Sequence, residues 1–154
     1  MMISKNLAEY HVWSCKKYRE LIASIPEEDY TKVINNRTIE GITSHIVAAL
    51  FTCFYTIEGS DDKFWEWLEE ATMKQILERW QELDIRLLKL ALALPTDSVN
   101  VPHVSETPFS LASEDFVMQY ILHTIHHRGQ LSLLLRDLGY DVPGTDYLHF
   151  FAEK

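Results

Sequence analysis

Glycine and proline are scarce in this chain, with five of each among 154 residues, and they are grouped at a few places. The segments between these groups are long and uninterrupted, and strands rarely fill segments of that length. Within them, apolar residues recur at steps of three and four, which is the period of an α-helix. The sequence therefore predicts an all-α fold.

Two long helices are expected in the first half of the chain. The first covers about residues 4–24, stops before Pro26, and is followed by an acidic connection at residues 27–29. The second begins at Thr38 or shortly after it and carries apolar residues at helical spacing as far as Gly59, a residue typical of a helix C-terminus. A short aromatic piece, FWEW, lies between this helix and the third.

The third and fourth helices are expected in the second half. Thr72 and Gln75 have the spacing of a capping box, and the helix that follows them ends at Pro95. Ser113, followed by two acidic residues, is a favourable start for a fourth helix that runs to about Leu138, with Gly139 beyond its end.

The segment 95–112 contains three of the five prolines. It is expected to be a long crossover link between helices 3 and 4, with some extended structure. Helices of about twenty residues are about 30 Å long, and packing four of them through their apolar faces gives a four-helix bundle. Residues 1–154 are therefore predicted to form a single four-helix-bundle domain.

Composition restricts the classes of function. Acidic residues outnumber basic ones by 23 to 14, for a formal charge of −9, and no run of Lys or Arg is present, so a nucleic-acid-binding surface is not expected. Cys15 and Cys53 lack CxxC spacing and suit buried free thiols in a reducing compartment. No signal sequence and no apolar run of about 18 residues is recognised, so a soluble, cytoplasmic protein without a membrane segment is expected.

Three histidines occupy positions that we assign to apolar helix faces. His123 and His127 are four residues apart, a spacing that turns a helix by about 40° and advances it about 6 Å, so both rings project from one side. His45 lies within the apolar pattern of the second helix. A bundle can bring the three imidazoles together, and three such ligands suit Zn, Ni, Cu or Fe with coordination positions left open.

The histidine pair alone is a weak signal, and the alternative is a set of hydrogen-bonded core histidines without an ion. His126 lies about 100° around the helix from His127 and is expected at the edge of the stripe. No chemistry is assigned to the three remaining histidines, His11, His103 and His149.

The run HTIHHRGQLSLLLRDLGYDVPGTDYLHFF, residues 123–151, resembles the C-terminal signature of the DinB-like (DinB/YfiT-like) metalloprotein family. The segments YHVWSCKKYRELIASIPEEDYTK and SHIVAALFTCFYTIEG resemble the first and second helices of that family, so the resemblance covers most of the chain and is weakest at 95–112. It implies a DinB/YfiT-like four-helix bundle whose metal ligands are His45, His123 and His127.

The resemblance also implies roles and partners. Second-shell or structural roles fall on the residues that match the family pattern around the ligands, namely Arg128, Gly129, Gln130, Asp146 and Tyr147. The family includes metal-dependent enzymes that activate a low-molecular-weight thiol, as well as suggested hydrolases, and homodimers are expected. The implied cofactor is a divalent transition metal, zinc or nickel, and the implied partner is a small-molecule substrate; the family name does not imply a DNA polymerase.

Two functions therefore stay open: a thiol S-transferase or related hydrolase, and a non-catalytic, metal-stabilised stress-response binding protein. No general base or other catalytic residue is identified. Trp13, Phe54 and Tyr120 are candidates for lining a substrate pocket.

Overall fold

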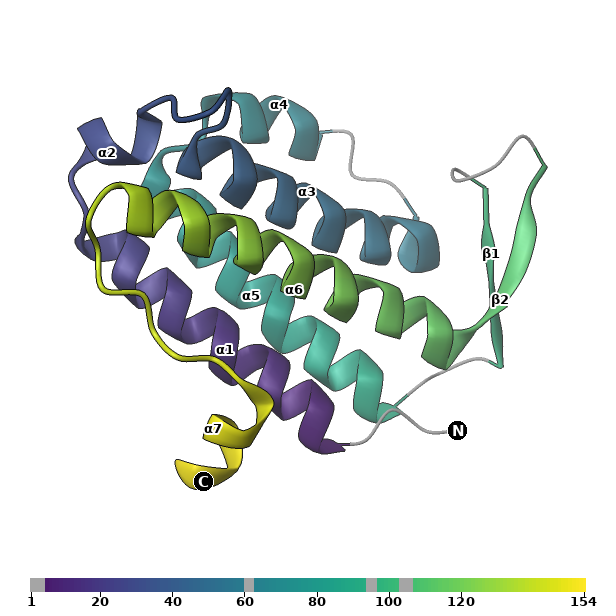
Figure 1. The fold of residues 1–154 in the computed structure, drawn as a ribbon. Helices are drawn as coiled ribbons and strands as arrows, with labels where there is room; N and C mark the ends of the chain where they lie inside the picture. The colour runs from purple at the N-terminus through teal and green to yellow at the C-terminus, as the bar shows by residue number, and fades with distance from the viewer. Residues whose placement is uncertain (1–4, 60–62, 94–96, 103–106) are drawn as a thin grey trace.

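The computed structural model describes residues 5–59, 63–93, 97–102 and 107–154, and in it four long helices lie side by side as a bundle (Figure 1). The described part contains seven helices and two strands: α1 (Lys5–Ser24), α2 (Glu27–Thr31), α3 (Ile39–Glu58), α4 (Lys63–Glu70), α5 (Met73–Ala93), β1 (Ser98–Val101), β2 (Phe109–Ala112), α6 (Ser113–Asp137) and α7 (Tyr147–Ala152). The all-α four-helix bundle predicted from the sequence is confirmed, with α1, α3, α5 and α6 as its members.

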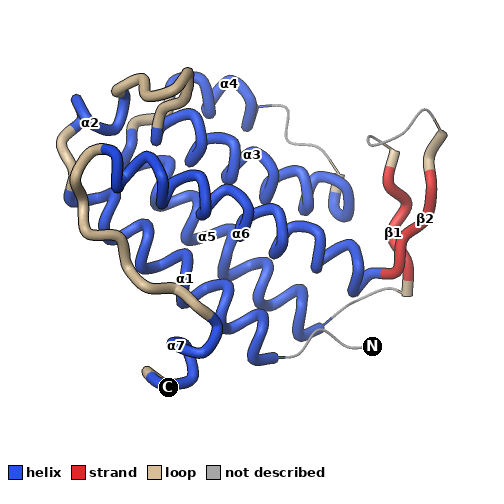
Figure 2. The backbone as a smooth tube through the Cα atoms, viewed as in Figure 1, coloured by secondary structure: helices blue, strands red, loops and turns tan. Residues whose placement is uncertain are grey.

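The order of the helices around the bundle differs from their order in the chain. α1 packs chiefly against α5, α5 against α3, and α3 against α6. α5 and α6 face each other across the bundle, so the link between them crosses its end, where it carries the two strands (Figure 2). α3 and α6 lie next to each other and run in opposite directions (Figure 1). Side chains on the shared edge of these two helices can therefore meet.

Residues at the predicted helix ends behave as expected. The Thr38 hydroxyl accepts a hydrogen bond from the Gly41 backbone N–H at 2.8 Å, and so caps α3. Thr72 and Gln75 form the reciprocal capping box before α5, with the Thr72 N–H donating to Gln75 Oε1 at 2.9 Å and the Gln75 N–H donating to Thr72 Oγ1 at 3.4 Å. Gly59 ends α3 with a φ of 95°, in the left-handed region that glycine adopts without strain.

The start of the fourth helix differs from the prediction. Ser113 is the first residue of α6, not its cap, and Ala112 precedes it as the end of β2. The two strands pair antiparallel, with Ser98 opposite Ala112, and the Ser113 N–H donates to the Asp97 carbonyl at 3.3 Å. The hairpin thus runs directly into the helix, and its pairing takes the place of a side-chain cap.

The predicted core faces of α3 and α6 are wrong by a small rotation. α6 buries Val117, Ile121, Thr124, Arg128, Leu131 and Leu135, whereas Tyr120, His123 and His127 are only partly buried. On α3 the buried residues include Ile42, Ile46 and Cys53, and His45 is exposed. Counting histidines as core residues placed each predicted stripe to one side of the buried face, although Ile42, Ile46 and Cys53 belong to both. The three histidines lie at the edge of the core, where solvent reaches them.

Two short helices pack the connecting segments against α3. Neither was predicted from the sequence. The acidic connection forms α2, whose Tyr30 is buried with its hydroxyl 2.8 Å from Thr43 Oγ1. The aromatic piece forms α4, in which the Phe64 ring stacks on Phe51 with centroids 3.6 Å apart. These contacts fix the chain on either side of α3.

α3 is also long and apolar enough, by composition, to cross a membrane. In this fold 44% of the apolar segment is buried, and the helix packs between α5 and α6, as the core helix of a soluble bundle does.

Cys15 and Cys53 are both buried and free, as predicted.

A buried charge network joins α1 to α5. The Asp84 carboxylate is fully buried and accepts hydrogen bonds from His11 Nε2 at 2.9 Å and from the Arg19 guanidinium. The Cys15 sulfur lies 4.0 Å from the ring nitrogens of His11. Burial opposes a charge on His11, but the interactions with Cys15 and Asp84 outweigh it and raise the pKa of the imidazole to about 10. A protonated His11 and Arg19 therefore share one carboxylate.

Removing that carboxylate should destabilise the bundle strongly. Asp84→Asn leaves two cations buried without a counter-charge, and we expect a loss of about 3–5 kcal/mol of unfolding free energy. Urea denaturation followed by circular dichroism measures it. Glu82→Gln is the matched control on α5, because Glu82 pairs with Arg79 at the surface and its loss should cost less than about 1 kcal/mol. Equal effects of the two substitutions would contradict the role given to Asp84.

The raised pKa of His11 predicts a pH dependence of stability. The folded-state pKa of about 10 lies above the ordinary value of about 6.5, so the folded protein binds the proton more tightly than the unfolded chain. The stabilisation is complete below about pH 6.5 and is lost as pH rises toward 10. Unfolding free energy should therefore fall over this range more steeply in the wild type than in His11→Gln. Parallel curves for the two proteins would show that His11 is not charged.

Candidate metal centre

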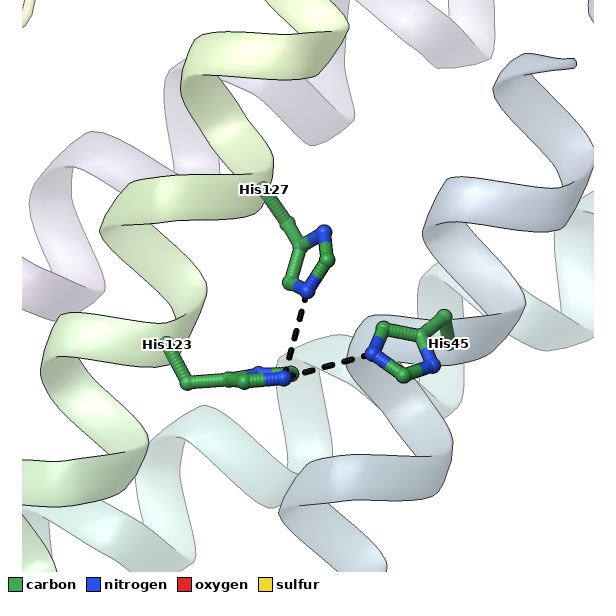
Figure 3. A group of neighbouring side chains, drawn as sticks. All are labelled: His45, His123 and His127. Carbon is green, nitrogen blue, oxygen red and sulfur yellow. Dashed lines mark hydrogen bonds between the residues drawn. The ribbon is translucent and has the colours of Figure 1, made fainter. Parts of the chain in front are cut away.

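Three imidazoles meet between α3 and α6. His45 comes from the first half of α3, and His123 and His127 come from successive turns of α6 (Figure 3). His123 Nε2 lies 3.2 Å from His45 Nε2 and 3.2 Å from His127 Nε2. The structure thus brings together all three of the residues selected from the sequence, each with the same nitrogen directed toward the others.

The spacing of the nitrogens fits a bound transition metal. Metal–nitrogen bonds of about 2.0–2.1 Å at a tetrahedral angle place two ligand nitrogens about 3.3 Å apart. The two distances of 3.2 Å agree with this value. The three ligand nitrogens also lie within 4.8 Å of one another, so the group could hold a metal ion.

Gln130 fixes the state of one ligand. Its Oε1 lies 2.9 Å from His127 Nδ1, so Nδ1–H is the donor and the lone pair of His127 is at Nε2, toward the other two rings. Gln130 Nε2 lies 2.8 Å from His126 Nε2 and donates to it. Gln130 thus links the rings of His126 and His127. Hydrogen bonds of this kind orient metal ligands in proteins.

Two of the three histidines, His123 and His127, have lowered pKa values. Burial and the neighbouring His127, His45 and His126 lower the pKa of His123 to about 4. Burial also lowers the pKa of His127, although the hydrogen bond to Gln130 opposes this shift. His123 Nδ1 is buried and has no hydrogen-bond partner among the described residues, so neither tautomer of this ring is imposed from that side. Near pH 7 the rings can present lone pairs instead of protons.

One side of the centre is open to solvent. His45 is exposed, and His123 and His127 are partly buried. Structural zinc sites are closed by four protein ligands, whereas sites that act on a substrate keep a free coordination position. The three-histidine arrangement at the bundle edge matches the second kind.

The other residues of the C-terminal pattern hold the chain end in place. Arg128 is buried and donates from Nη2 to the Tyr10 hydroxyl at 3.3 Å, and that hydroxyl donates to the Thr145 carbonyl at 2.8 Å. The Tyr147 ring packs edge-on against Tyr10, with centroids 5.0 Å apart. Arg128 therefore joins α6 to α1 and to the segment before α7, which is a structural role.

Gly129 lies on the exposed face of α6. A Cβ added there would meet nothing within 4 Å in the described part of the chain. No close helix contact within the chain therefore explains this glycine.

Of the remaining histidines, His149 is exposed on α7, and His103 lies outside the described residues. His11, Cys15 and Asp84 form a second group with donor atoms close enough to hold an ion. The Arg19 guanidinium already occupies one oxygen of Asp84, and a cation placed beside it would be repelled. The chemistry of this group favours the charge network over a metal.

The aromatic residues proposed as pocket walls are dispersed. Trp13 packs against Phe150 and donates to Glu153 near the chain end, and Phe54 is buried under the Arg86 guanidinium. Tyr120 precedes His123 by one turn of α6 and is partly buried. Tyr120 shares α6 with His123 and His127, Phe54 shares α3 with His45 at a separation of nine residues, and Trp13 lies on α1.

A pocket of about 570 Å³ is a groove between α1 and α5 and includes none of the three histidines. Two lysines on its rim pair with glutamates one turn away, Lys16 with Glu20 and Lys74 with Glu78. A smaller pocket of about 300 Å³ lies at the start of α3, on the helix that carries His45.

The bundle and its histidine cluster define a class of helical proteins with a candidate metal centre between two antiparallel helices. The DinB family model matches residues 1–153, and the chain belongs to that family. It is 26% identical to Protein DinB of Bacillus subtilis (strain 168), with 96% of this chain and 94% of that protein covered. A crystal structure of a candidate DinB-family member from Exiguobacterium sibiricum 255-15 has a TM-score of 0.70, at 20% identity over 94% of this chain and 98% of that one.

The geometry predicts metal binding that depends on each of the three imidazoles. Purified without a histidine tag, the wild type should retain one divalent ion per chain in elemental analysis. His45→Ala, His123→Ala and His127→Ala should each lose it while keeping a helical circular dichroism spectrum, because the rings lie at the edge of the core. His149→Ala is the matched control and should keep the ion. Wild-type metal content in His45→Ala would rule out the three-ligand centre.

Proposed function

We propose that this protein is a metal-dependent enzyme that activates a small thiol or water for transfer to an electrophilic substrate, as a thiol S-transferase or a related hydrolase. The observation that carries the proposal is the convergence of three histidine Nε2 atoms at a solvent-exposed edge. Three ligands and an open side leave space for a nucleophile. Membership of the DinB family supports the same proposal.

The residues of the chain prepare the centre. Gln130, held by His126, directs the lone pair of His127 toward the other rings. The lowered pKa of His123 keeps that ring neutral near pH 7, so protons do not compete with an ion there. Neutral ligands leave the charge of a divalent ion uncompensated. A bound zinc or nickel ion would supply a Lewis acid that lowers the pKa of a thiol or water at its open position.

A cytoplasmic location belongs to the same proposal. The two buried cysteines are free, which suits the reducing compartment where low-molecular-weight thiols are abundant.

The position of the centre also favours a second candidate. His45 belongs to α3, and His123 and His127 belong to α6, so an ion at the centre would brace the two helices. In that case the protein is a metal-stabilised binding protein without catalysis. The two candidates differ in what the metal-loaded protein does to a thiol. A bracing ion should raise the melting temperature without accelerating thiol transfer, whereas a catalytic ion should accelerate it.

Thiol transfer can be tested with monochlorobimane. The thiol sulfur forms a bond to the chloromethyl carbon, chloride leaves, and the thiol proton passes to water, so no oxidant or reductant is needed. The metal-loaded protein, given cysteine, coenzyme A, bacillithiol or mycothiol, should accelerate formation of the fluorescent conjugate with at least one of them. The rate should fall to the uncatalysed level in the metal-free protein and in His127→Ala.

The control is His149→Ala, which should react at the wild-type rate. Metal-loaded protein that gives no acceleration with any of the four thiols, together with a large drop in melting temperature on metal removal, would favour the bracing role and contradict the transferase.

A further inference from the structure

Arg37 lies on a rigid turn immediately before α3. Asn35 and Asn36 have φ values of 50° and 61°, and Ile34 and Arg37 exchange two backbone hydrogen bonds of 2.8 and 3.0 Å across them. A two-residue turn with both central residues in the left-handed region is a type I′ turn, and asparagine adopts that region more readily than most residues. The turn therefore fixes the backbone from which the Arg37 side chain projects.

A pocket of about 300 Å³ adjoins this turn. Its lining consists of Val33, Asn36, Arg37, Thr38, Gly41 and Ile42. Gly41 suits this position, because a Cβ there would come within 3.1 Å of the Thr38 hydroxyl oxygen that caps α3. His45 follows Gly41 by four residues, so it stands about 6 Å further along the same side of α3. The pocket and the histidine cluster are neighbours on one helix.

The charge of Arg37 is free to act on a ligand. Arg37 is exposed, and no described carboxylate lies within ion-pair distance of it, whereas Arg19, Arg79 and Arg86 each pair with one. Few positive charges are available in a chain with a net charge of −9. An uncompensated guanidinium that lines a pocket makes this a locally favourable place for an anion.

We propose that Arg37 and this pocket bind the carboxylate of a small anionic thiol, and so place its sulfur at the histidine centre. The planar guanidinium matches a carboxylate through two parallel hydrogen bonds. Val33 and Ile42 supply apolar contact for the carbon chain between the two ends. This inference rests on the proposed function, because it assigns the reactive end of the ligand to the metal centre.

The test uses two thiols that differ in charge. Protein loaded with cobalt(II) is titrated with 3-mercaptopropionate and with 2-mercaptoethanol, and sulfur ligation is followed by the charge-transfer absorption. Arg37→Gln should weaken the binding of 3-mercaptopropionate by about tenfold or more, since a hydrogen bond to a charged group contributes about 1.5–3 kcal/mol. Binding of 2-mercaptoethanol should be unchanged. Arg37→Lys should bind 3-mercaptopropionate with an intermediate affinity, because lysine keeps the positive charge but lacks the planar guanidinium.

Arg136→Gln is the matched control, because Arg136 is an exposed arginine in the last turn of α6 and does not line the pocket. It should bind both thiols as the wild type does. If Arg37→Gln weakens the binding of both thiols equally, or weakens the binding of neither, the inference is overturned.

A second ligand separates this inference from the proposed function. Succinate carries the carboxylate without a thiol, and calorimetry on the metal-free protein needs no ion. If neither thiol reaches the cobalt but succinate binds in an Arg37-dependent manner, the anion site stands and the thiol-transfer proposal fails. If both thiols bind the cobalt and Arg37→Gln leaves 3-mercaptopropionate and succinate unaffected, the anion site fails and thiol transfer stands.

Discussion

The approach of three imidazoles across the α3–α6 contact is the constraint on which the rest of the centre depends. His123 Nε2 lies 3.2 Å from two other nitrogens, yet a neutral imidazole carries only one N–H, so it can donate to only one of them. Protonating two of the three rings would place like charges together. The packing of α3 on α6 enforces this arrangement, and the arrangement in turn favours a cation that takes all the lone pairs.

The histidines could be selected from the sequence because their spacing is local. Positions four apart on a helix share a side whatever the rest of the fold does, which made the pairing of His123 with His127 predictable. Their depth was not predictable in the same way. The apolar pattern on α6 is broad, and treating the histidines as core residues rotated it, whereas the structure buries Ile121, Thr124 and Arg128. This difference matters, because edge histidines leave an open side and core histidines would not.

Contacts between distant parts of the chain could not be predicted from the sequence pattern. His11 and Asp84 are 73 residues apart, and no local rule pairs a histidine on one helix with an aspartate on another. The same holds for Arg37, whose position beside the centre depends on a turn and on the packing of α3 against α6. Asn35 and Asn36 could have indicated that turn, because consecutive asparagines tolerate left-handed backbone. Helix ends were predictable for the opposite reason, since the Thr72 and Gln75 cap is made within four residues.

The two polar clusters of the bundle show how surroundings decide the use of similar side chains. Around His11, burial opposes a charge, but Cys15 and the buried Asp84 carboxylate raise the pKa of the imidazole, and the same carboxylate pairs with Arg19. Around His123 and His127, no carboxylate among the described residues is paired with the rings, and burial lowers the pKa of both imidazoles. The first cluster therefore fixes α1 to α5, whereas the second lacks negative charge. A divalent ion at the second cluster would increase that deficit, and an anionic ligand that spans the ion and Arg37 would remove it.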